Sequence, residues 1–342
     1  MTRLYRTFTS QEEIDAQYDV EAMVADFAPV AAFFVDGSAA ARRDLDPRLG
    51  LRFGPTVDEY LDFFPAAASE SPGRGPAGRG RRPLLVFIHG GYWRILSARE
   101  FSLVARGPVA AGISVAVTNY ALCPGVTIDE ITRQSRAALA WLWAHADELD
   151  IDRERIFVAG HSAGGQQVGM LALTDWAGRY GLPGDLVKGG VAISGLFDLE
   201  PLAYSWLAPK LLLDHQTILR QSPQRWIPGT GANPPARTPP LLLTLGGDES
   251  AEFHRQTADF AAAWKAGGHR ATLLEQPGCD HFTAIHGFAE PGSRLMRAIV
   301  EMVAAPQVDT GQVPDRPRGR AAPAAFPTFG PPARPLAGEG PR

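Results

Sequence analysis

Short apolar segments alternate with longer amphipathic segments along the chain from Pro83 onward. Runs rich in branched and aromatic side chains predict strands at 84–88, 113–118, 155–159, 187–193, 240–245 and 271–275. Apolar positions at helical spacing predict helices near 97–111, 127–148, 163–178 and 253–267, with a last helix near 292–304. Such alternation is typical of a parallel sheet covered on both faces. The pattern therefore predicts an α/β protein with a mostly parallel central sheet flanked by helices.

Three regions outside this alternation carry patterns of their own. Residues 10–35 place Ile14, Tyr18, Met23 and Phe27 at near-helical spacing and predict an amphipathic helical lead-in. Residues 49–65 alternate in hydrophobicity around a Gly-Pro turn and predict two short strands. Residues 196–236 are rich in Leu, Trp and Pro without a strand pattern, so we expect an inserted cap over the end of the sheet.

The composition changes near residue 305. Residues 305–342 are dominated by Pro, Gly, Ala and Arg, and such a segment cannot bury enough apolar surface to offset the entropy lost on ordering. We therefore expect one domain over 1–304, with the cap insertion at about 196–236, and a disordered tail over 305–342. The Arg-, Gly- and Pro-rich segment 73–83 is expected to be a flexible surface loop.

The overall composition is that of an ordinary globular protein. The 342 residues are 45% hydrophobic and carry a formal net charge of −4, which argues against a nucleic-acid partner. Cys123 and Cys279 are too few for a disulfide framework, and the N-terminal residues lack the apolar core of a signal peptide. No run approaches the roughly 18 apolar residues of a membrane span. We expect a cytoplasmic protein that acts on a small molecule and binds no membrane; whether it forms a homodimer stays open.

A candidate nucleophile follows the predicted strand at 155–159. Residues 160–164 read Gly-His-Ser-Ala-Gly, the G-x-S-x-G pattern, and a helical apolar run comes directly after them. In this strand–turn–helix context the two glycines permit a turn so tight that a Cβ would clash, and the turn lifts the serine hydroxyl above the strand ends. The pattern predicts that Ser162 is a nucleophile rather than an ordinary helix cap.

A serine hydroxyl needs a base, and the base needs a carboxylate to hold it. His281 follows the last predicted strand by a short loop, which is where a base is expected; His286 is the less favoured alternative. In the chain order serine, acid, histidine, the acid should follow the strand at 240–245. Asp248 and Glu249 both satisfy this spacing.

The predicted strand 84–88 ends in His-Gly-Gly followed by two large aromatic residues. A tetrahedral intermediate carries negative charge on its oxygen, which preorganised N–H groups stabilise. We expect the N–H groups of Ala163, Gly90 and Gly91 to form this oxyanion hole, because glycines let the backbone approach the substrate. Tyr92 and Trp93 are expected either to wall the substrate pocket or to anchor the loop in the core.

These motifs together resemble the α/β-hydrolase superfamily, and within it the arylformamidase (kynurenine formamidase) branch. The resemblance runs from about Ile14 to Val303. The segments that carry it, besides the serine motif, are "HGGYW" at 89–93, "FGPTVDEYLDFFP" at 53–65, "AISGLFDLEPL" at 192–202 and "ESAEFHRQT" at 249–257. The branch's acid directly precedes a Ser-x-Glu-Phe-x-Arg-Gln stretch, so the resemblance favours Glu249 over Asp248. It implies an α/β-hydrolase fold and cleavage of an aryl formamide through an acyl-enzyme, without a metal or cofactor.

Other functions stay open at this point. Arylformamidases often carry an Asp-Lys pair where this chain has Ser97 and Ala98, which puts N-formylkynurenine itself in question as the substrate. A carboxylesterase acting on aryl or short-acyl esters would use the same residues. A hydrolase fold kept only as a binding module is a third reading, which the intact serine, acid and histidine argue against. The clustered H-x-G-T-H-x-D signature of metal-dependent formamidases does not occur in the sequence.

Overall fold

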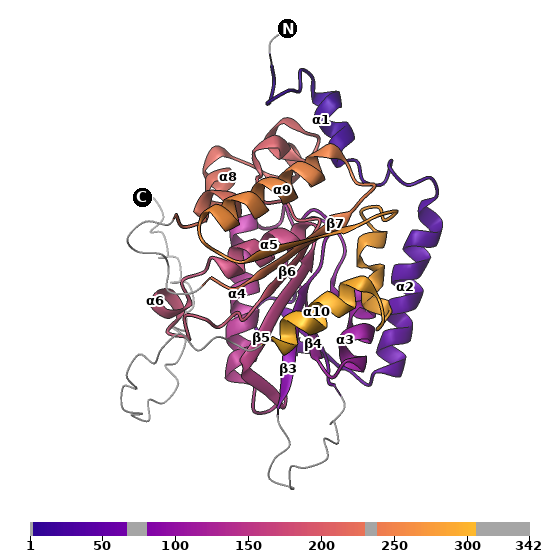
Figure 1. The fold of residues 1–342 in the computed structure, drawn as a ribbon, viewed down its shortest axis with the longest axis vertical. Coiled ribbons are helices and arrows are strands. Elements are labelled where there is room, and N and C mark those ends of the chain that lie inside the picture. The colour runs from indigo at the N-terminus through magenta and orange to yellow at the C-terminus, as the bar shows by residue number, and fades with distance from the viewer. Residues whose placement is uncertain (1–2, 67–80, 230–237, 306–342) are drawn as a thin grey trace, which may run out of the picture. The chain divides into compact units, whose positions relative to one another are not determined.

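The computed structural model describes residues 3–66, 81–229 and 238–305. Within these ranges, one eight-stranded sheet has the strand order β1-β2-β4-β3-β5-β6-β7-β8 (Figure 1). The strands are β1 (Arg48–Arg52), β2 (Tyr60–Phe64), β3 (Arg82–Ile88), β4 (Ser114–Thr118), β5 (Ile151–His161), β6 (Gly190–Ile193), β7 (Leu241–Gly246) and β8 (Ala271–Gln276). β2 pairs antiparallel with β1 and β4, and the pairs from β4 through β8 are all parallel. This confirms the predicted mostly parallel sheet and the two short strands at 49–65.

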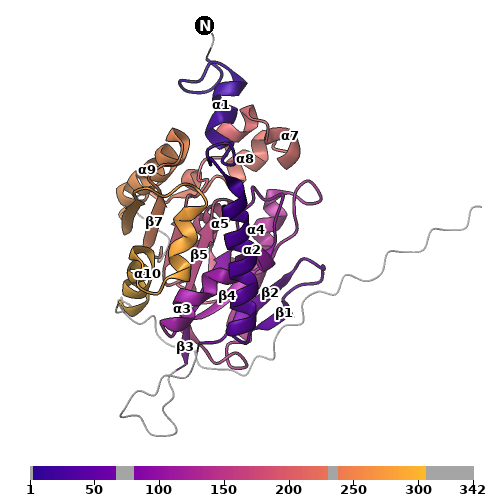
Figure 2. The ribbon, with the colours of Figure 1, turned by 90° about the vertical axis from the view of Figure 1, so that its right-hand side faces the viewer.

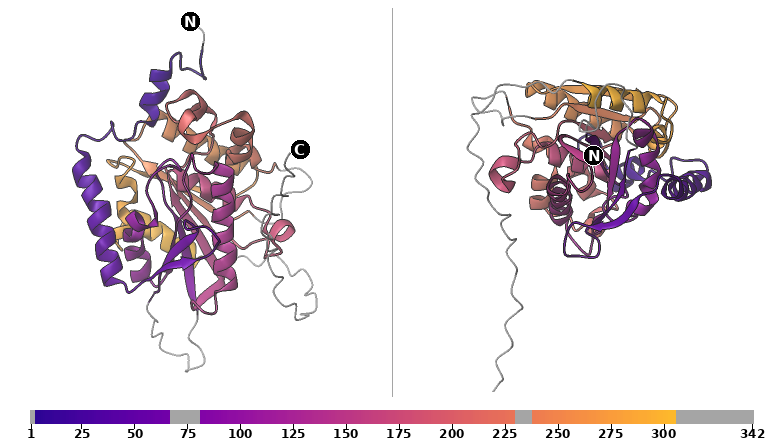
Figure 3. Two further views of the ribbon diagram at one scale, coloured as in Figure 1. Left: turned by 180° about the vertical axis from the view of Figure 1, so that it is seen from behind. Right: turned by 90° about the horizontal axis from the view of Figure 1, so that it is seen from below.

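Alternate residues of the central strands supply two hydrophobic cores on opposite faces of the sheet. On β3, Leu84, Val86 and Ile88 belong to one core, whereas Leu85 and Phe87 belong to the other. The first core is covered by α4 (Ile128–Ala144), α5 (Ala163–Ala172) and α9 (Ala251–Ala266). The second is covered by η1 (Ala98–Ala105), α3 (Arg106–Ala110), α10 (Arg294–Ala304) and, through its partly buried phenylalanines, α2 (Phe27–Asp44). Seen from behind, α2 and α4 lie on opposite sides of the sheet (Figure 3).

Parallel pairing brings the ends of β3, β5, β6 and β7 together at one edge of the sheet. Ile88 pairs with Gly160, His161 with Ile193, and Ile193 with Thr244. The loops that follow these strands therefore meet at this edge. They carry every side chain and peptide group that the sequence assigned to the site, except His281, which follows β8.

The cap and the N-terminal helix lie over the same edge. Residues 196–229 form η2 (Glu200–Tyr204), α7 (Ala208–Leu211), α8 (His215–Gln221) and η3 (Pro223–Trp226), and no strand occurs among them. α1 (Gln11–Tyr18) lies beside this cap, above the ends of the strands (Figure 2). Residues 230–236 of the expected cap, most of the predicted surface loop at 73–83 and nearly all of the predicted tail lie outside the described residues. The described residues, from residue 3 to Ala305, form one compact unit.

Three predicted helices are broken in the structure. The lead-in at 10–35 forms α1 and α2, which Ser10 and Asp26 cap separately. The helix expected at 97–111 is η1 followed by the short α3, because Pro108 is tolerated only in the first turn of an α-helix. The helix expected at 163–178 ends at Ala172, and α6 (Trp176–Tyr180) starts anew where the Asp175 side chain caps the Gly178 N–H. Apolar spacing continues across each break, which is why the pattern missed them.

Candidate active site

Ser162 lies at the sharp turn between β5 and α5, in a strained conformation. Its backbone has φ of 57° and ψ of −116°, a region that residues with a side chain rarely occupy. A Cβ on Gly160 would lie 2.3 Å from the Gly164 carbonyl oxygen, and a Cβ on Gly164 would lie 2.0 Å from the Ile88 carbonyl oxygen. Only glycine fits at either position. The turn has the strand–turn–helix geometry that the G-x-S-x-G pattern predicts, and Ser162, only 2% exposed, lines a cavity.

His281 and Glu249 form a buried hydrogen-bonded pair. The Nδ1–H of His281 donates to Glu249 Oε2 over 2.7 Å, and the two side chains come from the loops after β8 and β7. His281 and Ser162 line the same cavity, which has a volume of about 600 Å³. The Nδ1 contact leaves Nε2 on the opposite edge of the imidazole ring. The predicted serine, histidine and acid are thus brought to one place.

Asp248 and His286, the two alternatives, lie elsewhere. The Asp248 side chain is exposed, and the residue is fixed by its N–H bond to the Cys279 carbonyl. His286 lies on η4 (Thr283–Ala289), where its ring stacks on Phe33 with 3.7 Å between centroids. Burial lowers the pKa of His286, so this ring is neutral at pH 7. The geometry selects Glu249 and His281.

The His-Gly-Gly segment after β3 is held by two side-chain donors. The Tyr120 hydroxyl donates to the His89 carbonyl over 2.9 Å, and His89 Nδ1–H donates to the Gly90 carbonyl over 2.7 Å. In a trans peptide the N–H points away from the C=O of the same unit, so the N–H groups of Gly90 and Gly91 point away from these partners. A Cβ on Gly90 would lie 3.2 Å from the Ser162 Cβ, which places this backbone beside the serine.

Ala163 supplies the third expected N–H group. It is the first residue of α5, and the first N–H groups of an α-helix have no acceptor within the helix. The three predicted oxyanion donors therefore flank Ser162 from the β3 loop and from the start of α5.

Tyr92 and Trp93 have different positions, which settles their alternative roles. Tyr92 lines the cavity, and its hydroxyl donates to the Tyr18 carbonyl over 2.7 Å. Trp93 is fully buried beneath the loop and donates through Nε1 to Gln166 on α5. The expectation that Trp93 walls the pocket is therefore wrong: it anchors the loop in the core, and Tyr92 alone of this pair contacts the cavity.

His161 lies next to the nucleophile and belongs to the site, although no sequence pattern predicted a role for it. Its Nε2–H donates to the His281 carbonyl over 2.8 Å, and the two rings lie 4.6 Å apart. Burial, with a further contribution from His281, holds the pKa of His161 well below its usual range. A neutral His161 thus tethers the loop that carries His281. Its position within the serine motif was the only signal in the sequence.

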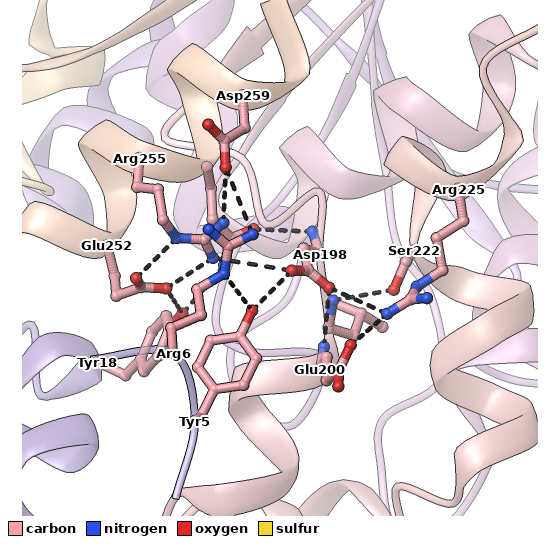
Figure 4. Close-up of polar contacts among 12 residues, drawn as sticks. Tyr5, Arg6, Tyr18, Asp198, Glu200, Ser222, Arg225, Glu252, Arg255 and Asp259 are labelled. Atoms are coloured by element: carbon pink, nitrogen blue, oxygen red, sulfur yellow. Dashed lines mark hydrogen bonds and ion pairs between the residues drawn. The ribbon is translucent and has the colours of Figure 1, made fainter. Parts of the chain in front are cut away.

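The N-terminal segment, residues 3–26, forms one wall of the cavity, which the sequence did not predict. Asp15, Tyr18, Asp19, Val20 and Glu21 all line it. Figure 4 shows how the segment is held on the cap and on α9. The Tyr5 hydroxyl donates to Asp198 over 3.0 Å and the Tyr18 hydroxyl to Glu252 over 2.9 Å, while Arg255 pairs with Glu252. Burial is the main cause that raises the pKa of Tyr5 to about 12, and it also raises the pKa of Tyr18 well above its usual value. Both hydroxyls therefore stay protonated donors.

The rest of the cavity lining combines aromatic rings with aliphatic side chains such as Val35, Ile95 and Leu96. Besides Tyr18 and Tyr92, its aromatic lining consists of Phe27, Phe34, Phe101, Trp206 and Phe282. In the described ranges, no group of three or more His, Cys, Asp or Glu side chains is placed to hold a metal ion. The helices in these ranges include none with the length and apolarity to cross a bilayer.

Comparison with known proteins identifies the family. The alpha/beta hydrolase fold family matches residues 85–285, more than half of the chain. The chain therefore belongs to the alpha/beta hydrolase fold family.

Its relatives include a formamidase and an ester hydrolase. The chain is 26% identical to kynurenine formamidase of Salmo salar over 270 residues, which are 78% of this chain and 86% of the relative. It is 36% identical to the carboxylic ester hydrolase LipN of Mycobacterium tuberculosis over 106 residues, 30% of this chain and 28% of the relative. A solved structure from Silicibacter sp., a suggested thioesterase, is similar with a TM-score of 0.69 at 29% identity, covering 86% of this chain and 99% of that chain. The chain is a hydrolase.

Proposed function

We propose that this hydrolase cleaves an aryl formamide or a related amide through an acyl-enzyme, with Ser162 as the nucleophile. The observation that carries the proposal is the 2.7 Å bond between His281 and Glu249, on the same cavity as a strained serine. Such a bond fixes the imidazole tautomer so that Nε2 can accept a proton. The hydrogen bond between nucleophile and base often tightens only in the substrate complex.

In the proposed first step, Ser162 Oγ attacks the formyl carbonyl carbon and His281 Nε2 takes the hydroxyl proton. The carbonyl oxygen becomes an oxyanion that the N–H groups of Gly90, Gly91 and Ala163 bind. Each such donor typically contributes about 3–4 kcal/mol of transition-state stabilisation. The C–N bond then breaks, and His281 gives its proton to the leaving arylamine nitrogen.

The second step reverses these roles with water. Water attacks the formyl-serine ester while His281 accepts its proton, and formate leaves as Ser162 regains a proton. Glu249 holds the imidazole in position and stabilises its positive charge in both steps.

The cavity supports an aromatic leaving group. Its volume of about 600 Å³ far exceeds what a formyl group needs, and its lining includes seven Phe, Tyr and Trp side chains. The similarity to kynurenine formamidases over most of the chain points to the same class of amide. Arylformamidases often carry an Asp-Lys pair where this chain has Ser97 and Ala98. Here Ser97 instead caps η1 and its hydroxyl donates a hydrogen bond to Glu100. The identity of the aryl group is therefore left open.

A carboxylesterase is the second candidate, and the local similarity to LipN favours it. Formanilide and phenyl formate share the formyl and phenyl groups and differ only in the leaving atom, so their kcat/KM values separate the two functions. We expect hydrolysis of both by the wild-type protein and of neither by Ser162→Ala. Turnover of the ester alone would overturn the formamidase proposal and leave the esterase.

A further inference from the structure

Ser194 lies at the end of β6, between the serine turn and Glu249. Its hydroxyl donates a 2.5 Å hydrogen bond to Glu249 Oε1, and both side chains are buried. The Gly246 N–H donates to the same oxygen over 2.7 Å. Oε1 is thus occupied by two donors, and Oε2 is left for His281. We propose that Ser194 is a positioning residue that holds the Glu249 carboxylate for His281, an inference that rests on the proposed roles of those two residues.

The backbone around Ser194 is tied directly to the nucleophile. The Ser162 N–H donates a hydrogen bond to the Ile193 carbonyl, and the Ser194 N–H donates one to the Thr244 carbonyl, each over 2.8 Å. The Ile193 carbonyl and the Ser194 N–H belong to the same peptide unit. One rigid peptide therefore fixes the separation between the serine turn and the residue that holds the acid.

Ser194 also has strained geometry, with φ of 51°. A residue with a side chain keeps such a conformation only where its surroundings enforce it, and such positions cluster at active sites. Glycine would adopt this backbone without strain. The presence of serine instead agrees with a use for its hydroxyl, which donates to Glu249.

Loss of the hydroxyl would leave Oε1 with the Gly246 N–H alone. A hydrogen bond to an ionised group is about twice as strong as one between neutral groups. The carboxylate would then be free to turn about its terminal bonds, and His281 would lose its fixed partner for part of the time. The expected loss is in the chemical step, since Ser194 does not line the cavity.

Ser194→Ala and Ser194→Gly form a matched pair for the test. Both remove the hydroxyl, but alanine keeps the strained backbone and glycine relieves it. The readouts are the rate at which a fluorophosphonate labels Ser162, and kcat and KM on phenyl acetate. We expect both variants to lower the labelling rate and kcat by about 10- to 100-fold, with KM unchanged. In a Glu249→Gln background, Ser194→Ala should change the residual rate by no more than about two-fold, because the carboxylate is already gone and the Gly246 N–H still holds the amide oxygen in place.

Ser135→Ala is the control, since Ser135 is a buried serine on α4 whose hydroxyl has no hydrogen-bond partner within the described ranges. It should label at the wild-type rate. Labelling of Ser194→Gly at the wild-type rate would overturn the inference. So would a Ser194→Ala substitution that lowers the rate by the same factor in the wild-type protein and in Glu249→Gln. The glycine variant decides the question if the alanine variant does not fold. Absence of Ser162 labelling in the wild-type protein would instead refute the proposed function, and the inference would fall with it.

Discussion

Replacing His281 with glutamine is expected to lower kcat by about 10⁶-fold, with the protein still folded. Ser162 would keep its strained position, but among the described residues no other titratable side chain is both bonded to the acid and placed on the same cavity. His161, the nearest histidine, is neutral and already uses its Nε2–H to hold the His281 carbonyl. The measurement is the steady-state rate on phenyl acetate and on formanilide, with circular dichroism to verify folding.

His286→Gln is the matched control, five positions further along. His286 lies on η4, where its ring stacks on Phe33 of α2. The same substitution there should leave kcat within about two-fold of the wild-type value. A loss at His286 as large as that at His281 would show that the base has been assigned to the wrong residue.

Replacing Glu249 with glutamine is expected to lower kcat by about 10⁴-fold. Ser194 and Gly246 both donate hydrogen bonds to Oε1, so the amide oxygen of glutamine would take that position. The amide nitrogen would then face His281 Nδ1 and donate to it. This forces the proton onto Nε2, where the imidazole can no longer accept the Ser162 proton. The effect appears in kcat, and KM should change little.

Asp248→Asn is the control for Glu249→Gln, because it removes the neighbouring carboxylate by an equally small change. Asp248 is exposed and is held only through its backbone. We expect a change in kcat of no more than about two-fold. A larger loss of kcat in Asp248→Asn than in Glu249→Gln would contradict the assignment of Glu249 as the acid.

The sheet and the serine turn could be predicted from the sequence because both leave local signals. Strands buried on both faces appear as continuous apolar runs, as on β3 and β7. The tight turn at Ser162 requires glycine on both sides, and this requirement is visible as a five-residue pattern. Parallel pairing then places the loops after β3, β5 and β7 at one edge, so local patterns predicted a site made of distant residues.

The N-terminal wall of the cavity left no such signal. Tyr18 contacts Glu252 across 234 positions of sequence, and neither residue lies in a pattern that implies the other. The role of Ser194 was hidden for a similar reason, since its partner follows another strand. Spacing could not separate Asp248 from Glu249, because only the direction of each side chain distinguishes adjacent residues in a loop. The resemblance to arylformamidases favoured Glu249, and the bond to His281 agrees with it.

Mass spectrometry of the protein after reaction with a fluorophosphonate tests the nucleophile most directly. We expect a single adduct, on the peptide that contains Ser162. It should form rapidly in the wild-type protein, slowly in His281→Gln and not at all in Ser162→Ala. An adduct on another residue, or phenyl acetate hydrolysis that survives in Ser162→Ala, would contradict it.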